Sequence, residues 1–192
     1  DVACIGKIVF SFLPHGSHHV CTMESVILLP KDINPKEAVF LANMETAVNL
    51  VQDGNPGLGD RVVVLGQGIV GLLVSGVLSE FPLAGLYSVE SLDGRRTLSS
   101  QAGVHETFSP VCKNDITALK DKLKQQDARG GADVVFELTG SPEALNLAVD
   151  FCAYSGRIVV GSWYGTKRAE INLGEKFNRN RLAIVSSQVS TI

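Results

Sequence analysis

Residues 61–80 read RVVVLGQGIVGLLVSGVLSE, and the interpretation of the whole chain depends on this stretch. A short apolar run leads into Gly66, Gly68 and Gly71, and a second apolar run follows them. Between a strand and a helix, this G-x-G-x-x-G spacing permits a tight turn, close approach of a pyrophosphate and close packing of the helix on the strand. The N–H groups at the start of such a helix attract phosphate. The stretch therefore predicts a phosphate-binding turn that also includes the residues between the glycines, Gln67, Ile69 and Val70.

The glycine spacing alone is a weak signal, because 19 of the 192 residues are glycine, so its context matters. Apolar runs typical of strands recur at 61–65, 85–90, 106–110, 132–138, 156–162 and 181–187. Helix-like segments separate them at 70–80, 94–102, 115–127, 141–153 (Ser141 as cap, Pro142 first) and 174–180. Strands that are apolar throughout are covered on both faces, as in a parallel sheet. The alternation predicts an α/β fold with a doubly wound parallel sheet of six strands.

The segment before residue 61 has a different pattern. Short β-type runs are expected at 7–13 and 19–29. A helix is expected over 34–54, since Asn34 can cap it, Pro35 suits its first turn and Gly54 can stop it.

Glu90 ends the second predicted strand, 24 residues after Gly66. A dinucleotide-binding fold places at about this distance the carboxylate that accepts hydrogen bonds from the adenine ribose. A glutamate at this position would repel a ribose phosphate, so the cofactor is expected to be NAD. Arg95 and Arg96 follow closely and keep NADP as an alternative. The competing interpretation of Glu90 is a surface residue at a strand end.

Two further turns follow the fourth and fifth predicted strands, at the sheet edge where ligands of such folds bind. Thr139 and Gly140 are expected to contact the ribose on the nicotinamide side. Gly161, Ser162 and Trp163 are expected to line the nicotinamide face. Ordinary loop packing is the alternative for both turns.

The composition of the chain argues against some classes of binding partner. The net charge of −3 argues against nucleic acid, and no apolar run approaches the roughly 20 residues that span a bilayer. Four scattered cysteines without a C-x-x-C pair indicate reduced thiols and a cytoplasmic location. His15, His18 and His19 could suggest a metal site, but no thiol or carboxylate stands at ligand spacing, so a polar loop is the preferred interpretation.

Three stretches carry a family resemblance: GDRVVVLGQGIVGLL at 59–73, the whole of 131–165, and NRLAIVSSQVS at 180–190. Together they resemble the medium-chain dehydrogenase/reductase superfamily, in particular its zinc-type alcohol, sorbitol and threonine dehydrogenases, over residues 7–192. The resemblance implies a fragment of a GroES-like catalytic domain with a linking helix at 1–46. It also implies an NAD(P)-binding Rossmann domain at 47–181, then the last strand and a return toward the catalytic domain at 182–192.

The resemblance also implies individual residue roles. Thr46 would lie beside the nicotinamide, and Arg95 near the adenine ribose. The family's early cysteine and His-Glu zinc ligands would precede Asp1, and its third ligand position falls at Ala42, which has no donor atom. Zinc is therefore not expected in this chain, and its catalytic residues are unknown. The last strand could pair two copies into a homodimer.

The expected function is hydride transfer between nicotinamide and a small-molecule alcohol or carbonyl substrate. This chain alone is expected to bind the cofactor without turning over an alcohol. A nucleotide-binding module without catalysis is one alternative, because the zinc ligands are absent. A methyltransferase is a weaker one, since it also uses a glycine loop and an acid after the second strand.

Overall fold

The computed structural model describes residues 4–125 and 130–189. It divides into two compact units, Asp1–Ala42 and Asn43–Ile192. The boundary inferred from the family resemblance, after residue 46, falls inside a helix of the second unit. The assignment of these units to a partial catalytic domain and a cofactor domain stays a prediction.

The first unit contains little regular structure. The β-type runs expected at 7–13 and 19–29 reduce to two short antiparallel strands, β1 (Val9–Phe10) and β2 (Ile27–Leu28). A 3₁₀ turn, η2 (Met23–Ser25), precedes β2. The short helix α1 (Pro35–Ala38) begins as predicted, because the Asn34 side chain accepts a hydrogen bond from the N–H of Lys36 at 3.0 Å.

The single helix expected over 34–54 was wrong, since the structure contains two helices, α1 and α2 (Leu41–Gly54). The break falls at Val39 and Phe40, where the N–H of Phe40 bonds three residues back to Glu37. β-Branched and aromatic residues are weak helix formers, which is consistent with a break there. The second helix does end at Gly54, but the left-handed conformation belongs to Asn55, at φ 46°.

Gly54 is needed for packing rather than for the turn. A Cβ atom at this position would lie 2.5 Å from Cζ of Phe136, a fully buried ring in the centre of the sheet. The end of α2 can therefore approach the sheet closely only without a side chain.

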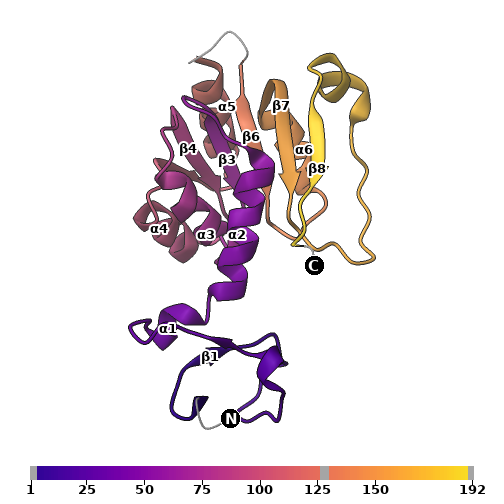
Figure 1. The fold of residues 1–192 in the computed structure, drawn as a ribbon. Coiled ribbons are helices and arrows are strands. Elements are labelled where there is room, and N and C mark those ends of the chain that lie inside the picture. Colours follow the sequence, from indigo (N-terminus) through magenta and orange to yellow (C-terminus); the bar gives the residue numbers. More distant parts are fainter. Residues whose placement is uncertain (1–3, 126–129, 190–192) are drawn as a thin grey trace. The chain divides into compact units, whose positions relative to one another are not determined.

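The second unit is built on a six-stranded sheet in the order β5-β4-β3-β6-β7-β8, with every neighbouring pair parallel (Figure 1). Its strands are β3 (Arg61–Leu65), β4 (Gly85–Val89), β5 (Glu106–Phe108), β6 (Ala132–Glu137), β7 (Cys152–Val160) and β8 (Ala183–Ser186). The remaining helical segments are α3 (Ile69–Ser79), α4 (Asp93–Gln101), α5 (Lys113–Gln125), α6 (Ala144–Phe151) and the π-helical turn η3 (Leu173–Phe177). The predicted six-stranded, doubly wound parallel sheet is confirmed.

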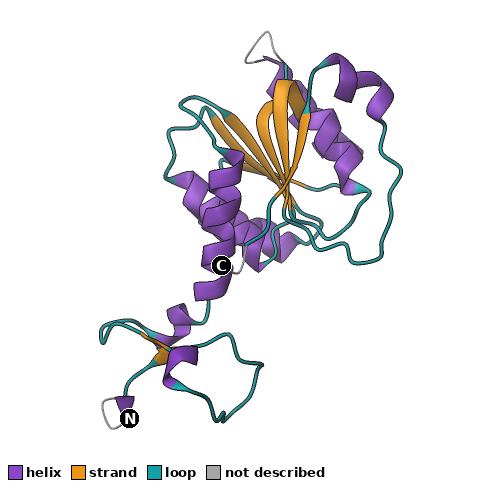
Figure 2. Ribbon diagram, turned by 45° about the vertical axis from the view of Figure 1, so that its right-hand side comes forward, coloured by secondary structure: helices purple, strands orange, loops and turns teal. Residues whose placement is uncertain are grey.

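Helices cover both faces of this sheet, as the uniformly apolar strands predicted (Figure 2). Along β3, Val63 and Leu65 belong to one buried cluster, together with residues of α5 and α6. Val62 and Val64 belong to the other, with residues of α2 and α3. All five residues of β3 are buried, so the strand that leads into the glycine turn is fixed from both sides.

Several predicted boundaries shift. The helix expected from Pro142 begins at Ala144, and Ser141 does not cap it, because its hydroxyl bonds to the Glu143 carboxylate instead. The expected helix end at 152–153 is already strand, because Cys152 pairs with Ala132 of β6 at the start of β7. The last two residues of the helix expected over 115–127 lie outside the described residues.

The four cysteines are free thiols. Burial raises the pKa of the Cys152 thiol to about 12, so this side chain remains protonated and is a packing residue.

Candidate functional site

The three glycines of the turn have three different structural roles. Gly66 adopts a positive φ of 88°, and a Cβ atom there would lie 2.8 Å from the carbonyl oxygen of Leu138. At Gly71 a Cβ atom would lie 2.1 Å from the carbonyl oxygen of Gly66. Nothing lies within 4 Å of the corresponding position at Gly68, the N-cap of α3. The turn therefore needs two glycines for its own shape and leaves the third open to an incoming group.

At the start of α3, N–H groups have no protein partners among the residues that the structure describes. The first N–H of the turn with a partner inside the helix is that of Leu72, which bonds to the carbonyl of Gly68 at 2.9 Å. Within the described residues, the structure shows no hydrogen bond from the N–H groups of Ile69 or Val70. Together with the positive end of the helix dipole, these groups can bind a phosphate.

Gln67 stabilises the turn through its side chain. Its side chain is fully buried, with Nε2 donating to the carbonyl of Gly66 at 3.1 Å and Oε1 accepting from the hydroxyl of Ser75 at 3.1 Å. Its backbone N–H donates to the Glu90 carboxylate at 2.8 Å. Both polar ends are thus occupied by the protein, and Gln67 acts on a ligand only through the shape of the turn.

Glu90 is held at the end of β4 by a set of donors. Oε2 accepts from the N–H of Gln67, and Oε1 accepts from the N–H of Leu92 at 3.0 Å and from the hydroxyl of Ser91 at 3.1 Å. An ionised carboxylate has about four acceptor positions, so these three donors leave about one. Only 6% of the residue surface is exposed. The carboxylate is therefore fixed in orientation, with room for one further donor.

The surroundings of Glu90 favour its charged form. Burial by itself would raise the pKa of Glu90, but the N–H groups of Leu92 and Gln67, the Ser91 hydroxyl and the Arg95 guanidinium together hold that pKa below its usual value. Arg95 Nη1 lies 3.8 Å from Oε2 on a side chain that is 50% exposed. Arg96 instead turns back to the backbone and donates to the carbonyl of Glu90 at 2.6 Å. Of the two arginines, Arg95 is the one placed to meet a ligand.

A cavity of about 610 Å³ lies at the carboxyl ends of the strands. The glycine turn, the Glu90 segment with Arg95, and the turn after β6 together with the start of α6 line it. It therefore extends across β3 and β6, where the strand order of the sheet reverses, which is the position at which folds of this class bind ligands. Of the predicted residues, Gly66, Gly68, Glu90, Arg95 and Thr139 line this cavity.

The turns after β6 and β7 are joined to each other. The N–H of Gly140 donates to the hydroxyl of Ser162 at 2.8 Å, and the Lys167 ammonium donates to the carbonyl of Gly140 at 2.7 Å. Gly161 has no room for a side chain, since a Cβ atom would lie 2.6 Å from Leu50 and 2.7 Å from Leu138. The two segments predicted for the nicotinamide side thus form one connected structure.

Glu137, the last residue of β6, was missed by the sequence analysis. It is fully buried, and Oε1 accepts from both the N–H and the hydroxyl of Thr139, at 2.8 and 2.5 Å. Oε2 accepts from the Tyr164 hydroxyl. A carboxylate at the end of an otherwise apolar strand was the available signal, because a buried charge requires partners.

Nine predicted residues lie outside the cavity lining: Gln67, Ile69, Val70 and Gly71 of the glycine turn, Gly140, Gly161 and Ser162 of the joined turns, and Thr46 and Trp163. Thr46 is half-buried in α2, and Trp163 is 84% exposed. Their assignments to the nicotinamide stay predictions.

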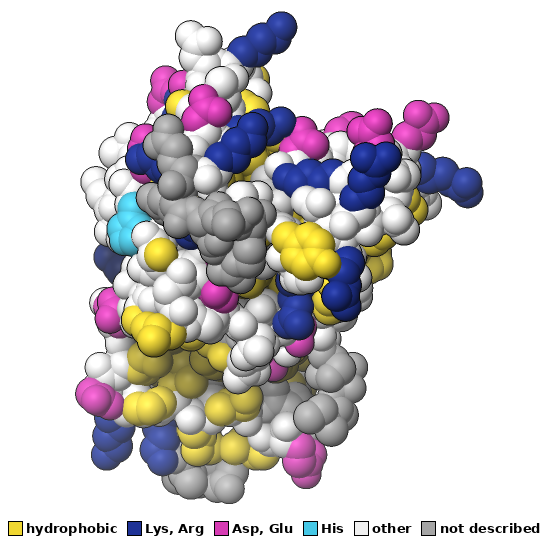
Figure 3. Space-filling model, turned by 90° about the horizontal axis from the view of Figure 1, so that it is seen from above, with side chains coloured by type: hydrophobic (Ala, Val, Ile, Leu, Met, Phe, Trp, Pro, Cys, Tyr) yellow, Lys and Arg dark blue, Asp and Glu magenta, His cyan; other side chains and the backbone are white. Residues whose placement is uncertain are grey.

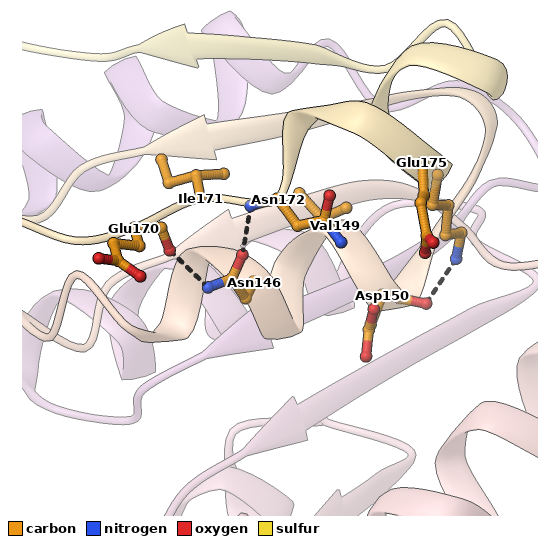
Figure 4. Close-up of a pocket in the computed structure, with 8 residues that line it drawn as sticks. Asn146, Val149, Asp150, Glu170, Ile171, Asn172 and Glu175 are labelled. Atoms are coloured by element: carbon orange, nitrogen blue, oxygen red, sulfur yellow. Dashed lines mark hydrogen bonds between the residues drawn. The ribbon is translucent and has the colours of Figure 1, made fainter.

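A second cavity, of about 500 Å³, lies between α6 and residues 170–176 (Figure 4). Asn146 connects its two sides, donating to the carbonyl of Glu170 at 2.8 Å and accepting from the N–H of Asn172 at 3.0 Å. Lys176 donates to the carbonyl of Asp150 at 2.5 Å. None of the predicted site residues lines this cavity, and its hydrogen bonds attach the segment before β8 to the helix.

Comparison with known proteins gives the family. A family model described as zinc-binding dehydrogenase matches residues 70–191, more than half of the chain. The chain belongs to the zinc-binding dehydrogenase family. The resemblance inferred from the glycine turn and the later strands is thereby confirmed.

Relatives of this zinc-binding dehydrogenase chain include D-xylulose reductase A from Aspergillus oryzae, 28% identical over 156 residues, or 81% of this chain and 43% of the relative. A protein described as a zinc-binding dehydrogenase from Sinorhizobium meliloti 1021, bound to NADP, matches in structure with a TM-score of 0.75 and 20% identity over 85% of this chain and 47% of that one. A structure described as a short-chain alcohol dehydrogenase from E. coli CFT073, complexed with NADH, matches with a TM-score of 0.76 and 18% identity. The match covers 88% of this chain and 48% of that one. The chain thus spans less than half the length of each of these relatives, and the structural matches confirm the fold.

The family name implies zinc, and the described residues do not fit it. Among them, no group of three or more His, Cys, Asp or Glu side chains could hold a metal ion. His18 bonds to the neighbouring Ser17 hydroxyl at 3.2 Å, and all three loop histidines are exposed. No reaction step is therefore assigned to a metal on this chain.

Two other expectations concern membranes and nucleic acids. No helix in 4–125 or 130–189 is long and apolar enough to cross a membrane. On the face drawn in Figure 3, Lys and Arg side chains are interspersed with Asp and Glu side chains. This face, where it is described, offers no broad surface of a single charge to a nucleic acid.

Proposed function

We propose that this member of the zinc-binding dehydrogenase family binds NAD and that the whole protein transfers hydride between the nicotinamide and a small alcohol or carbonyl compound. The observation that carries the proposal is the link between Glu90 and the glycine turn. The Gln67 N–H fixes the carboxylate, which lines the same cavity as Gly68, the N-cap of α3. In the described residues, the next two N–H groups of that helix, at Ile69 and Val70, show no hydrogen bond. A ribose hydroxyl and a pyrophosphate need this pair of acceptor and donors side by side.

The residues in and around the cavity have separate proposed tasks. The N–H groups of Ile69 and Val70 would bind the pyrophosphate, and Glu90 would accept a hydrogen bond from the adenine ribose. The joined turns that contain Thr139, Gly140, Gly161 and Ser162 would orient the nicotinamide half. The cofactor supplies the hydride chemistry, and the chain supplies position and electrostatics. The relative named D-xylulose reductase supports a small polyol or ketose as the substrate class. The proposed location is the cytoplasm.

Calorimetric titration of the chain with NADH, NADPH and S-adenosylmethionine tests this function. We expect NADH to bind more tightly than NADPH and S-adenosylmethionine not to bind. Binding of S-adenosylmethionine alone would support a methyltransferase, and binding of none of the three would refute the cofactor site. Added alcohols should give no steady NADH production from this chain alone.

Replacing Glu90 with glutamine should reverse the cofactor preference. The amide removes the negative charge that repels a ribose phosphate, while Arg95 remains to attract it. We expect NADH affinity to fall about tenfold, the loss of one charge-assisted hydrogen bond, and NADPH affinity to rise. Glu80→Gln, an exposed glutamate just after α3, is the matched control and should change neither affinity. Unchanged affinity for both cofactors in Glu90→Gln would contradict the assignment.

The lowered pKa of Glu90 gives a pH prediction. The charged form of Glu90 is favoured in the folded chain. The stability that this carboxylate contributes is therefore fully present above the ordinary glutamate pKa of about 4.3, and it is lost as the pH falls through the lowered pKa. NAD affinity should therefore be constant with respect to this group from pH 8 to pH 5. A loss of affinity centred above pH 5, and absent in Glu90→Gln, would show that this pKa is raised instead.

We also propose that the chain forms a homodimer through β8. In the described part of the chain, this strand lies at the edge of the sheet beside β7, and it exposes Ile184. An unpaired edge can add a strand from a second copy. Light scattering after gel filtration should give twice the chain mass of 20.5 kDa, and Ile184→Lys should give the monomer mass. A monomer in both cases would exclude pairing through this edge.

A further inference from the structure

Glu137 connects two turns that are far apart in the sequence. Its Oε1 holds the turn after β6 through Thr139, and its Oε2 holds the turn after β7 through Tyr164. The hydroxyl of Ser162 adds a further connection, donating to the Glu137 carbonyl at 3.3 Å while accepting from Gly140. One buried carboxylate is therefore common to both segments.

The position of Glu137 in the sheet relates it to one half of a bound dinucleotide. Folds of this class consist of two mononucleotide-binding halves that meet where the strand order reverses, here between β3 and β6. Glu90 directly follows β4, on one side of this point, and Glu137 ends β6, on the other. The turns that Glu137 joins therefore belong to the half opposite the adenine ribose.

Folding alone does not require a carboxylate at this position. A buried charge loses hydration, and apolar residues of similar volume often stabilise a core as well or better. Glu137 keeps three hydrogen bonds, and all three reach residues of the two turns rather than the core. Burial and the neighbouring Glu137 both raise the pKa of Tyr164, so its hydroxyl remains a donor across the physiological range.

We propose that Glu137 is a positioning residue that holds the turns after β6 and β7 in the arrangement that binds the nicotinamide half of the cofactor. It acts through Thr139 and Tyr164. The proposal rests on the function proposed above, because it assumes that the cavity binds a nicotinamide dinucleotide.

Glu137→Gln tests the proposal, with NADH and ADP as paired ligands. The amide is neutral and its nitrogen cannot accept a hydrogen bond, so one of the two turns loses its charged acceptor and its hydroxyl must reverse direction to keep a bond. NADH affinity should fall about tenfold, as expected for one lost hydrogen bond to a charged group. ADP lacks the nicotinamide and its ribose, so its affinity should stay within about twofold of the original value. Calorimetry of the whole chain measures both.

Tyr164→Phe keeps the proposal testable if Glu137→Gln does not fold. It removes one hydrogen bond and leaves Glu137 with Thr139, so NADH affinity should fall about threefold to tenfold with ADP unchanged. Tyr154→Phe, on an exposed tyrosine of β7, is the matched control and should alter neither affinity. In Glu137→Gln, adding Tyr164→Phe should cause little further loss, because both changes break the same connection.

The outcomes separate the two proposals. If the unchanged chain binds neither ligand, the cofactor site and this inference are both overturned. If the unchanged chain binds NADH and both variants bind it equally well, only the role of Glu137 is overturned. An equal loss of NADH and ADP would show that Glu137 has a general structural role, which also overturns its assignment to the nicotinamide half.

Discussion

Gly71→Ala should abolish dinucleotide binding. The added Cβ would lie 2.1 Å from the carbonyl oxygen of Gly66, and because that oxygen belongs to the backbone and the Cβ position is fixed, no side-chain rotation can relieve the contact. Either α3 or the turn must move, and the open N–H groups of Ile69 and Val70 move with it. We expect affinity for NADH to fall at least a hundredfold and the free energy of unfolding to fall by about 1–3 kcal/mol.

Gly76→Ala is the matched control for this change, since Gly76 lies in the same helix with nothing within 4 Å of its Cβ position. Alanine favours a helix by about 1 kcal/mol over glycine, so this variant should be slightly more stable and bind NADH normally. Calorimetry and urea unfolding measure both quantities. Normal binding by Gly71→Ala would mean that the turn can open without cost, contrary to the proposed site.

Arg61→Met should cause the largest loss of stability. Arg61 is buried, donates to the carbonyl of Leu123 at 3.0 Å, and lies 3.5 Å from the Asp133 carboxylate, which also accepts from the Arg61 N–H at 2.9 Å. These contacts connect β3, the end of α5 and β6. Methionine removes the positive charge beside Asp133 and the hydrogen bond to Leu123, and breaking a buried ion pair typically costs about 3–5 kcal/mol. Urea unfolding measures the difference.

Lys120→Met is the comparison for a surface pair. Lys120 lies 2.7 Å from Asp150, and both side chains are partly exposed, so its loss should cost less than about 1 kcal/mol. Equal effects of the two substitutions would show that burial of Arg61 contributes nothing to its importance. Because Arg61 lies at the opposite end of β3 from the glycine turn, NADH affinity of the folded Arg61→Met variant should be unchanged.

The sheet was predictable from the sequence because its strands are apolar on both faces and alternate along the chain with helix-like segments. The spacing from Gly66 to Glu90 was informative because one helix and one strand of ordinary length lie between them. The break at Val39 and Phe40 was not predictable, because the flanking residues suit a helix. The start of β7 at Cys152 depends on its pairing with Ala132, a contact between distant residues.

The site was predictable only where backbone geometry demands a residue type. Gly66 and Gly71 are examples, since each lacks room for a side chain. Glu137 ends β6, two residues before Thr139, but its importance depends on Tyr164, which is 27 residues away. The inward direction of the Gln67 side chain likewise depends on Ser75, in the next helix. Such partners follow from the folded arrangement and not from local pattern.

The hydrogen bond from Gln67 to Glu90 has a kinetic consequence. The turn and the carboxylate already hold each other in place before any ligand arrives, so little conformational entropy remains to be lost there on association. A ligand that meets this end of the cavity would need no slow rearrangement of the turn. The adenine half of the cofactor would therefore bind first, and its nicotinamide half would bind afterwards.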